Sequence, residues 1–240
     1  MFVLIHGAWH GAWCWSRLQE SLTSLGALST AIDLPGHGAD ASPPDGLTLD
    51  SYADRVLEVL ADIDEPVVLV GHSLGGATVS TVAERAPERL EALVYVCALL
   101  QPSGASPADL HANHPDSELL AAIEVSEDGL LTSIRSDAAP ELFYGDCSPA
   151  EAADATGRLV AEPTGPAMST IATTAERWGS IPRAYVRCGL DRAIVPSEQD
   201  RMVAEVGADV VVEISASHSP FLSRPDELAA ALVDIREGLA

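Results

Sequence analysis

The chain of 240 residues predicts an α/β fold, in which a six-stranded, mostly parallel sheet is flanked by helices and carries an inserted cap. Apolar runs of strand length alternate with segments of helix length, which is typical of a parallel sheet covered on both faces. The alternation stops between about residues 99 and 182 and then resumes. A strand, a tight turn and a helix surround residue 73. At this length one domain is expected.

Each element is expected from its apolar pattern. The predicted strands are at residues 2–5, 28–32, 67–70, 92–97, 184–188 and 210–214, and the predicted helices are at residues 16–25, 51–63, 74–86, 197–206 and 226–238. The interruption is rich in Ala, Asp, Glu, Ser and Pro. We therefore interpret residues 99–182 as a cap over a cleft, and residues 1–98 and 183–240 as the core.

Ser73 lies at the centre of the sequence Gly-His-Ser-Leu-Gly, which matches the pattern G-x-S-x-G. The apolar run 67–70 precedes it and a helical segment follows, and this context is that of a nucleophile elbow. In such an elbow the serine projects from a sharp turn between strand and helix. Because a serine hydroxyl is a weak nucleophile, it needs a base, and the base needs an acid that orients it.

His218 is the best candidate for the base. In folds that use this elbow the chain order is Ser, then Asp or Glu, then His. Only His111, His114 and His218 follow Ser73, and the first two lie in a Pro-, Asp- and Ser-rich stretch. His218 follows the last predicted strand, residues 210–214, within the sequence Ala-Ser-His-Ser-Pro, so both elimination and position favour it.

Asp191 is the preferred acid, since it follows the predicted strand 184–188 after only two residues. Asp200 and Asp209 are alternatives, but Asp200 falls within a predicted helix and Asp209 precedes the last strand. An ordinary turn aspartate is the competing interpretation of Asp191.

An oxyanion hole requires two backbone N–H groups. Leu74, directly after the nucleophile at a helix N-terminus, is expected to supply one of them. Ala8, in the loop after the first strand, is expected to supply the other, because Gly7 before it permits a close backbone approach. His6 and His10 are expected to shape this loop.

Several segments together resemble the α/β-hydrolase superfamily, in its branch of plant methylesterases and hydroxynitrile lyases, with bacterial carboxylesterases and pyrethroid hydrolases as relatives. They are residues 2–13, the elbow, residues 143–149 with a Cys-Ser-Pro sequence, and residues 176–183, 191–196 and 217–221. The resemblance implies that Ser73, Asp191 and His218 form the triad. It also implies a cofactor-independent serine carboxylesterase that acts on small or hydrophobic esters.

Two other functions stay open. Hydroxynitrile lyases of this branch carry a lysine beside the catalytic histidine and a threonine after the histidine of the first strand. This chain has Ser219 and Gly7 at those places, and it contains no lysine, which disfavours a lyase. The second alternative is a ligand-binding protein with slow turnover, because fold alone does not establish activity.

A substrate pocket is expected between cap and core. Its candidate lining residues are Gly7, Trp9, Leu99, Phe143, Tyr144, Met168, Trp178 and Phe221. Each aromatic ring could equally hold the cap to the core. His111 and His114 have the spacing H-x-x-H, but no third ligand is apparent, so we expect no metal and no cofactor.

The net charge of −23 argues against nucleic acid and anionic membranes as partners. It fits either adaptation to high salt or a proteome that is generally acidic and poor in lysine. The four cysteines lack metal or disulfide spacing, and the N-terminus enters a core strand without a signal-like segment, so a cytoplasmic location is expected. The expected partner is a small-molecule ester, and a homodimer is possible.

Overall fold

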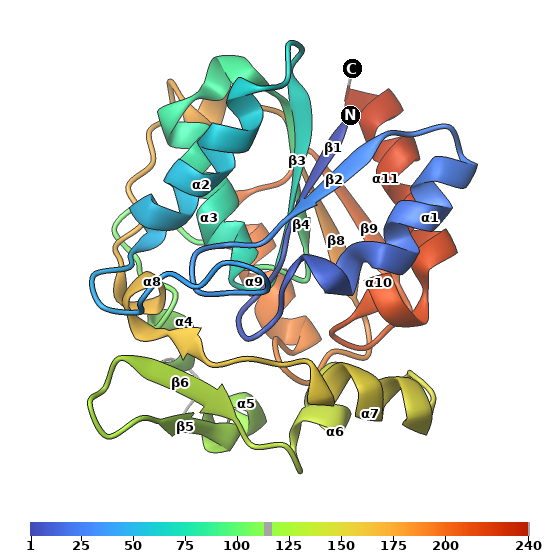
Figure 1. Ribbon diagram of the computed structural model, residues 1–240. Coiled ribbons are helices and arrows are strands. Elements are labelled where there is room, and N and C mark those ends of the chain that lie inside the picture. Colours follow the sequence, from blue (N-terminus) through green and yellow to red (C-terminus); the bar gives the residue numbers. More distant parts are fainter. Residues whose placement is uncertain (113–116, 240) are drawn as a thin grey trace.

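The computed structural model describes residues 1–112 and 117–239 (Figure 1). Its main sheet has six strands in the order β2-β1-β3-β4-β8-β9, and every pairing is parallel. The strands are β1 Phe2–Ile5, β2 Ser29–Ile32, β3 Val67–His72, β4 Leu90–Val96, β8 Arg183–Cys188 and β9 Val210–Ile214. The predicted α/β fold is confirmed, and each strand bound lies within two residues of its expected place.

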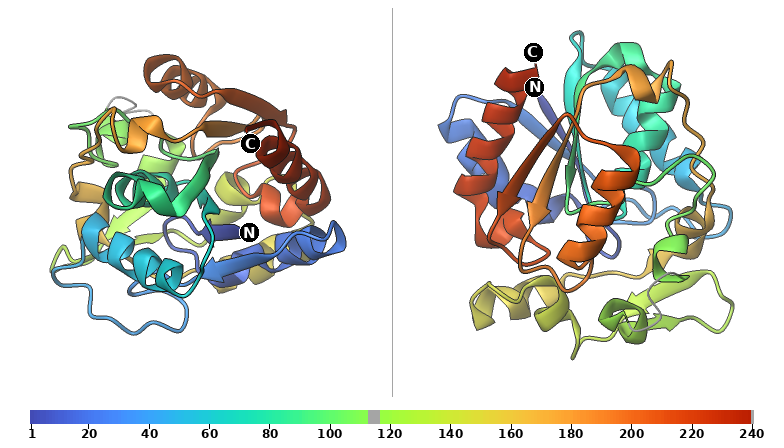
Figure 2. Two further views of the ribbon diagram at one scale, coloured as in Figure 1. Left: turned by 90° about the horizontal axis from the view of Figure 1, so that it is seen from above. Right: turned by 180° about the vertical axis from the view of Figure 1, so that it is seen from behind.

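Helices cover both faces of this sheet (Figures 1 and 2). On one face lie α1 Ser16–Ser24 and α11 Pro225–Leu239; on the other lie α2 Leu49–Ala61, α3 Gly75–Arg85 and α9 Pro196–Val206. Successive side chains of a strand point to opposite faces of the sheet, so alternate residues pack into the hydrophobic core on one face or on the other. In β1, for example, Val3 packs with α2 and α3, whereas Leu4 packs with α1 and α11.

Short elements complete the core. The 3₁₀ helices are η1 Ala12–Trp15, η2 Pro87–Arg89 and η3 Trp178–Ser180, and a short helix α10 spans Pro220–Ser223. Local signals explain several helix starts. Thr48 caps α2 by accepting the N–H of Ser51, and proline stands in the first turn of α9 and α11.

Residues 99–112 and 117–168 lie along the edge formed by the carboxyl ends of the strands, and residues 169–182 return past α3 to the start of β8 (Figure 1). This segment contains α4 Asp109–Ala112, α5 Glu118–Ala122, β5 Ile123–Val125, β6 Leu131–Ile134, α6 Ala139–Phe143, α7 Pro149–Gly157, β7 Glu162–Pro163 and α8 Thr164–Met168. The strands form a small antiparallel sheet in the order β5-β6-β7, which the sequence analysis did not anticipate. They are too short and too polar to produce an apolar run.

Cys14, Cys97 and Cys188 are buried, Cys147 is half-buried, and all four are free thiols. Cys97 directly follows β4, and Cys188 ends the neighbouring strand β8. At Cys188 a hydrogen bond from the Cys97 thiol lowers the pKa and burial raises it, and the pKa is raised overall. Burial also raises the pKa of Cys97. Within the described ranges, no helix has both the length and the apolarity that crossing a bilayer requires.

Candidate active site

Ser73 occupies the turn between β3 and α3 with a φ of 51°, in the left-handed region that non-glycine residues rarely adopt. Close packing surrounds it: a Cβ on Gly71 would lie 2.7 Å from the carbonyl oxygen of Gly75, and a Cβ on Gly75 would lie 2.7 Å from that of His6. The Ser73 carbonyl accepts the N–H of Leu99 at 3.0 Å. Strand and helix therefore hold the serine in the strained geometry of a nucleophile elbow.

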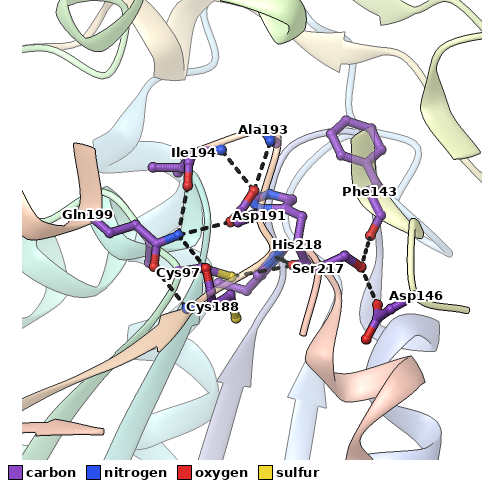
Figure 3. A network of polar contacts seen from close by, with 12 residues as sticks. Cys97, Phe143, Asp146, Cys188, Asp191, Ala193, Ile194, Gln199, Ser217 and His218 are labelled. Atoms are coloured by element: carbon purple, nitrogen blue, oxygen red, sulfur yellow. Dashed lines mark hydrogen bonds and ion pairs between the residues drawn. The ribbon is translucent and has the colours of Figure 1, made fainter. Parts of the chain in front are cut away.

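Asp191 and His218 form a buried pair. The Nδ1 of His218 lies 2.7 Å from Oδ2 of Asp191, and both residues are about 2% exposed. The other carboxylate oxygen accepts the backbone N–H groups of Ala193 at 2.8 Å and Ile194 at 2.9 Å (Figure 3). Gln199 Nε2 donates to Oδ2 at 3.3 Å. These donors fix the orientation of the carboxylate and aim Oδ2 at one ring nitrogen of His218.

The histidine loop contacts the elbow directly. His72 Nε2 donates to the carbonyl oxygen of His218 at 2.7 Å, and the two rings lie 4.5 Å apart. The Cys97 thiol donates to the same oxygen at 3.4 Å. On its other side the loop contacts the cap, where the Ser217 hydroxyl donates to the Asp146 carboxylate (Figure 3). The three residues predicted to form the triad thus come from three adjoining loops at one edge of the sheet.

The N–H groups of Ala8 and Leu74 are both available for an oxyanion. Within the described part of the chain neither has a hydrogen-bond acceptor, and both residues line the same cavity as Ser73. The loop that carries Ala8 is held by the two histidines expected to shape it. His6 Nδ1 donates to the Gly7 carbonyl at 2.9 Å, and His10 Nδ1 donates to the Ala8 carbonyl at 2.8 Å.

Gly7→Ala should lower kcat by about 10²–10³-fold, the cost of misplacing one oxyanion donor. The added Cβ would lie 2.7 Å from Ser73 Cβ and 2.8 Å from His72 Nδ1, so the loop with Ala8 must move. Steady-state ester hydrolysis measures the effect. Gly157→Ala is the matched control, because a Cβ there meets nothing within 4 Å. Equal rates for the two variants would contradict the placement of Ala8.

The cavity beside Ser73 has a volume of about 180 Å³ and is mostly apolar. Its lining residues are Ala8, Trp9, Ser73, Leu74, Leu99, Pro107, Ala108, Leu110, Leu119, Ile123, Thr132, Glu162, Thr164, Ala167, Met168 and Ile194. Trp9, Leu99 and Met168 were expected there. Most of the others come from the cap, and the sequence analysis missed them because no periodic pattern marks which cap side chains face inward.

Five predicted lining residues lie elsewhere. Tyr144 is 1% exposed, and its hydroxyl lies 2.9 Å from His10 Nε2. Gly7 abuts the backbone of the elbow. Phe143, 1% exposed, lies one layer back, between the rings of Trp9 and His218. Phe221 is fully buried beneath the elbow, 4.8 Å from the rings of Trp15 and His72. The prediction is corrected for these residues: Gly7 has no side chain, and the aromatic rings fill the core around the loops that carry Ser73 and His218.

Trp178 also belongs to the core packing and not to the cavity lining. Its Nε1 donates to the Tyr95 hydroxyl at 2.9 Å, and the Arg183 guanidinium lies 3.9 Å from its ring centroid. This tryptophan therefore joins the returning end of the segment 99–182 to the sheet and to α3. The sequence analysis had left this role, holding the cap to the core, open for each aromatic residue.

His72, Cys97 and His218 place potential metal-ligand atoms within 4.8 Å of one another. These groups are already engaged: His72 Nε2 and the Cys97 thiol donate to the His218 carbonyl, and His218 Nδ1 faces Asp191. We therefore assign these three side chains to the packing of the loop that carries His218 against the elbow. His114 and the side chain of His111, the pair with H-x-x-H spacing, lie outside the described residues.

Three buried histidines are neutral. Burial lowers the pKa of His6 and His72 well below the usual value, and it lowers that of His10 to about 4. Tyr144 reinforces this state by placing its hydroxyl 2.9 Å from His10 Nε2, where it donates to the unprotonated nitrogen. Each ring can therefore serve as a hydrogen-bond donor through one nitrogen only, which fixes its tautomer.

These histidines should make the fold sensitive to acid. Because their folded pKa values lie below the unfolded value of about 6.5, the unfolded chain binds more protons, and stability falls as pH drops below about 6.5. For His10 alone, the shift to about 4 corresponds to about 3 kcal/mol lost by the time pH falls below its folded pKa. Urea unfolding across this pH range measures the loss of unfolding free energy. In the His10→Gln variant the unfolding free energy should depend less on pH. A flat wild-type profile would contradict the assignment.

Comparisons with known proteins cover nearly the whole chain. The family model described as "Alpha/beta hydrolase family" matches residues 2–231. Putative methylesterase 14, chloroplastic, of Arabidopsis thaliana is 32% identical over 98% of this chain and 72% of its own length. Salicylic acid-binding protein 2 of Nicotiana tabacum is 31% identical over 98% of this chain and 96% of its own length. The crystal structure of a pyrethroid hydrolase from Sphingobium faniae JZ-2 has a TM-score of 0.89 at 28% identity, covering 98% of this chain and 96% of its own. The matches confirm the resemblance drawn from sequence.

Proposed function

This chain belongs to the α/β-hydrolase family, and we propose on that premise that it is a cofactor-independent serine carboxylesterase acting through an acyl-enzyme on Ser73. The observation that carries the proposal is the buried pair of Asp191 and His218, held against an elbow whose serine lines an apolar cavity. The names of its relatives, which include methylesterases and a pyrethroid hydrolase, support ester hydrolysis.

The geometry suits two-step acyl transfer. His218 Nδ1 is engaged by Asp191, so Nε2 is the nitrogen that removes the proton as Ser73 Oγ attacks the ester carbonyl. The resulting oxyanion accepts the N–H groups of Ala8 and Leu74. When the C–O bond of the ester breaks, His218 returns the proton to the departing alkoxide. A water molecule, deprotonated by the same histidine, then hydrolyses the acyl-enzyme and restores Ser73.

The cavity supports small or hydrophobic ester groups as the substrate class. Its volume of about 180 Å³ is below the range of about 300–1,000 Å³ typical of ligand pockets, so it suits one small moiety of an ester. The position after His218 holds Ser219, whose buried hydroxyl has no partner within the described residues, and the chain has no lysine. Since Ser219 is uncharged, this position offers no cation to hold a cyanide charge, and hydrolysis is favoured over a lyase reaction.

The remaining expectations form part of the same proposal. The four free thiols suit a reducing cytoplasm. The net charge of −23 favours an uncharged small-molecule ester over nucleic acid or an anionic membrane surface. No group in the proposed mechanism requires a metal or an organic cofactor, since the proton transfers and the oxyanion contacts all use atoms of this chain.

Hydrolysis of p-nitrophenyl esters of increasing acyl length tests the proposal, in low and in high salt. We expect turnover with a burst of p-nitrophenol, a rate that falls once the acyl chain exceeds the cavity, and a fluorophosphonate adduct on the peptide containing Ser73. The salt series shows whether the acidic surface needs counterions. Absence of both turnover and adduct would refute the esterase proposal and leave slow-turnover ligand binding as the alternative to examine.

A further inference from the structure

Glu162, in β7 of the cap, is a buried acid that the mechanism above does not use. It is 3% exposed and lines the cavity beside Ser73. Its carboxylate accepts three hydrogen bonds from three separate core segments. Oε2 accepts the backbone N–H of Trp9 at 3.0 Å and His37 Nε2 at 2.7 Å, and Oε1 accepts the Tyr52 hydroxyl at 2.7 Å.

His37 supplies the charge that balances this carboxylate. Its Nδ1 faces the carbonyl oxygen of Pro35 at 3.2 Å and its Nε2 faces Glu162, so both ring nitrogens meet acceptors and both carry protons. Burial alone would lower the pKa of His37, but the charge of Glu162 and its hydrogen bond outweigh this and raise the pKa. A buried carboxylate without such a partner would cost several kcal/mol. Oε2 of Glu162 thus has two donors, the His37 ring and the Trp9 N–H.

The contact with Trp9 acts on the oxyanion loop. The peptide before Ala8, which carries the Ala8 N–H, is held because its carbonyl accepts from His6 at 2.9 Å. The peptide after Ala8 is held at both edges: its carbonyl accepts from His10 at 2.8 Å, and its N–H, that of Trp9, donates to Glu162. The direction of the Ala8 N–H therefore depends on hydrogen bonds to the peptides on both sides of it.

Trp9 would not keep this conformation by itself. Its φ of 61° lies in the left-handed region, which costs a non-glycine residue about 1–2 kcal/mol. Two other contacts join Trp9 to the cap: its carbonyl accepts the Val160 N–H at 2.9 Å, and its Nε1 donates to the Thr132 carbonyl at 3.2 Å. With Glu162 replaced, these contacts still hold the cap, while the peptide after Ala8 loses one of its two anchors.

We propose that Glu162 is a positioning residue of the oxyanion hole: through the backbone N–H of Trp9, and balanced by His37, this cap carboxylate aims the N–H of Ala8 at the reacting carbonyl. The inference rests on the proposed esterase function. It means that the oxyanion hole is complete only when the cap contributes its carboxylate, although both oxyanion donors belong to the core.

Glu162→Met tests the inference, because it removes the acceptor and keeps most of the side-chain volume. We expect kcat to fall about 100-fold, as for a misplaced oxyanion donor. Affinity for a trifluoromethyl ketone, which becomes an oxyanion when Ser73 adds to it, should fall by a similar factor. Affinity for the methyl ketone of the same chain length, which binds without forming the oxyanion, should change less than about threefold. A purely structural role would weaken both ketones alike and would overturn the inference.

Two further variants are matched to this one. Tyr52→Phe removes another hydrogen bond to the same carboxylate without touching Trp9, and it should leave kcat within about threefold. Glu162→Gln should restore most of the activity, because an amide oxygen can still accept from the Trp9 N–H. A Gln variant as impaired as the Met variant would contradict the role of that hydrogen bond.

If Glu162→Met does not fold, Glu162→Asp decides the matter, since it keeps a carboxylate in β7 but withdraws it from the Trp9 N–H. The same selective loss of trifluoromethyl ketone affinity is expected, and unchanged affinity would overturn the inference. Wild-type turnover separates the two proposals. An inactive wild type refutes the esterase function, whereas an active wild type with fully active Glu162 variants refutes only the role of Glu162.

Discussion

Ser73→Ala should lower kcat/KM for an activated ester by about 10⁵–10⁶-fold, the loss typical of removing the nucleophile of a triad. In the proposed mechanism the hydroxyl oxygen of Ser73 is the atom that forms the acyl-enzyme. The fold should survive, because the Ser73 hydrogen bonds that hold the elbow to Val96 and Leu99 use only its backbone. Residual rate enhancement should come from the N–H groups of Ala8 and Leu74.

Steady-state kinetics with the best p-nitrophenyl ester measure this loss, and a fluorophosphonate should no longer label the variant. Ser219→Ala is the matched control: it removes a buried serine hydroxyl beside His218 that has no partner within the described residues, and its rate should change by less than about threefold. A Ser73→Ala enzyme that retains wild-type activity would show that ester hydrolysis arises elsewhere in the molecule.

Asp191→Asn should lower kcat by about 10⁴-fold while the fold is retained. Oδ1 accepts two backbone N–H groups, from Ala193 and Ile194, so the amide oxygen must take that position. The amide NH₂ then faces His218 Nδ1 and donates to it. The ring proton moves to Nε2, and the histidine can no longer remove the proton of Ser73.

Asp200→Asn is the matched control, since Asp200 was an alternative acid and is the partner of Arg187 on the surface of α9. Its activity should stay within about threefold of wild type. Thermal unfolding of both variants should show that neither has lost the fold. An Asp191→Asn enzyme within about tenfold of wild type would show that Asp191 does not set the tautomer of His218.

The core could be predicted because its signals are local. Each strand of the sheet is a short apolar run and each flanking helix has its own pattern, so alternation alone indicated a parallel sheet. Parallel strands bring their carboxyl ends to one edge, and residues that follow three of them, Ser73, Asp191 and His218, therefore lie close together. The structure brings Asp191 to within 2.7 Å of His218 across 27 positions of the chain.

The cap was less predictable, because its short polar strands are stabilised by contacts distant in sequence. Glu162 shows the reason most clearly: its partners Trp9, His37 and Tyr52 are 153, 125 and 110 positions away. An isolated Glu before a proline carries no sign that it will be buried. The aromatic residues failed as pocket predictions for a related reason, since a pattern of residue types cannot tell whether Phe143 or Phe221 faces a cavity or fills the space behind it.

The sequence by itself determined the α/β architecture, the elbow and the order of the candidate triad, since each depends on neighbouring residues and on the rule that parallel strands end at one edge. Only the tertiary structure decided which side chains line the cavity and how the loop after β1 is held. Those features depend on packing and on paired buried charges such as Glu162 and His37, which form only when distant segments exclude water together.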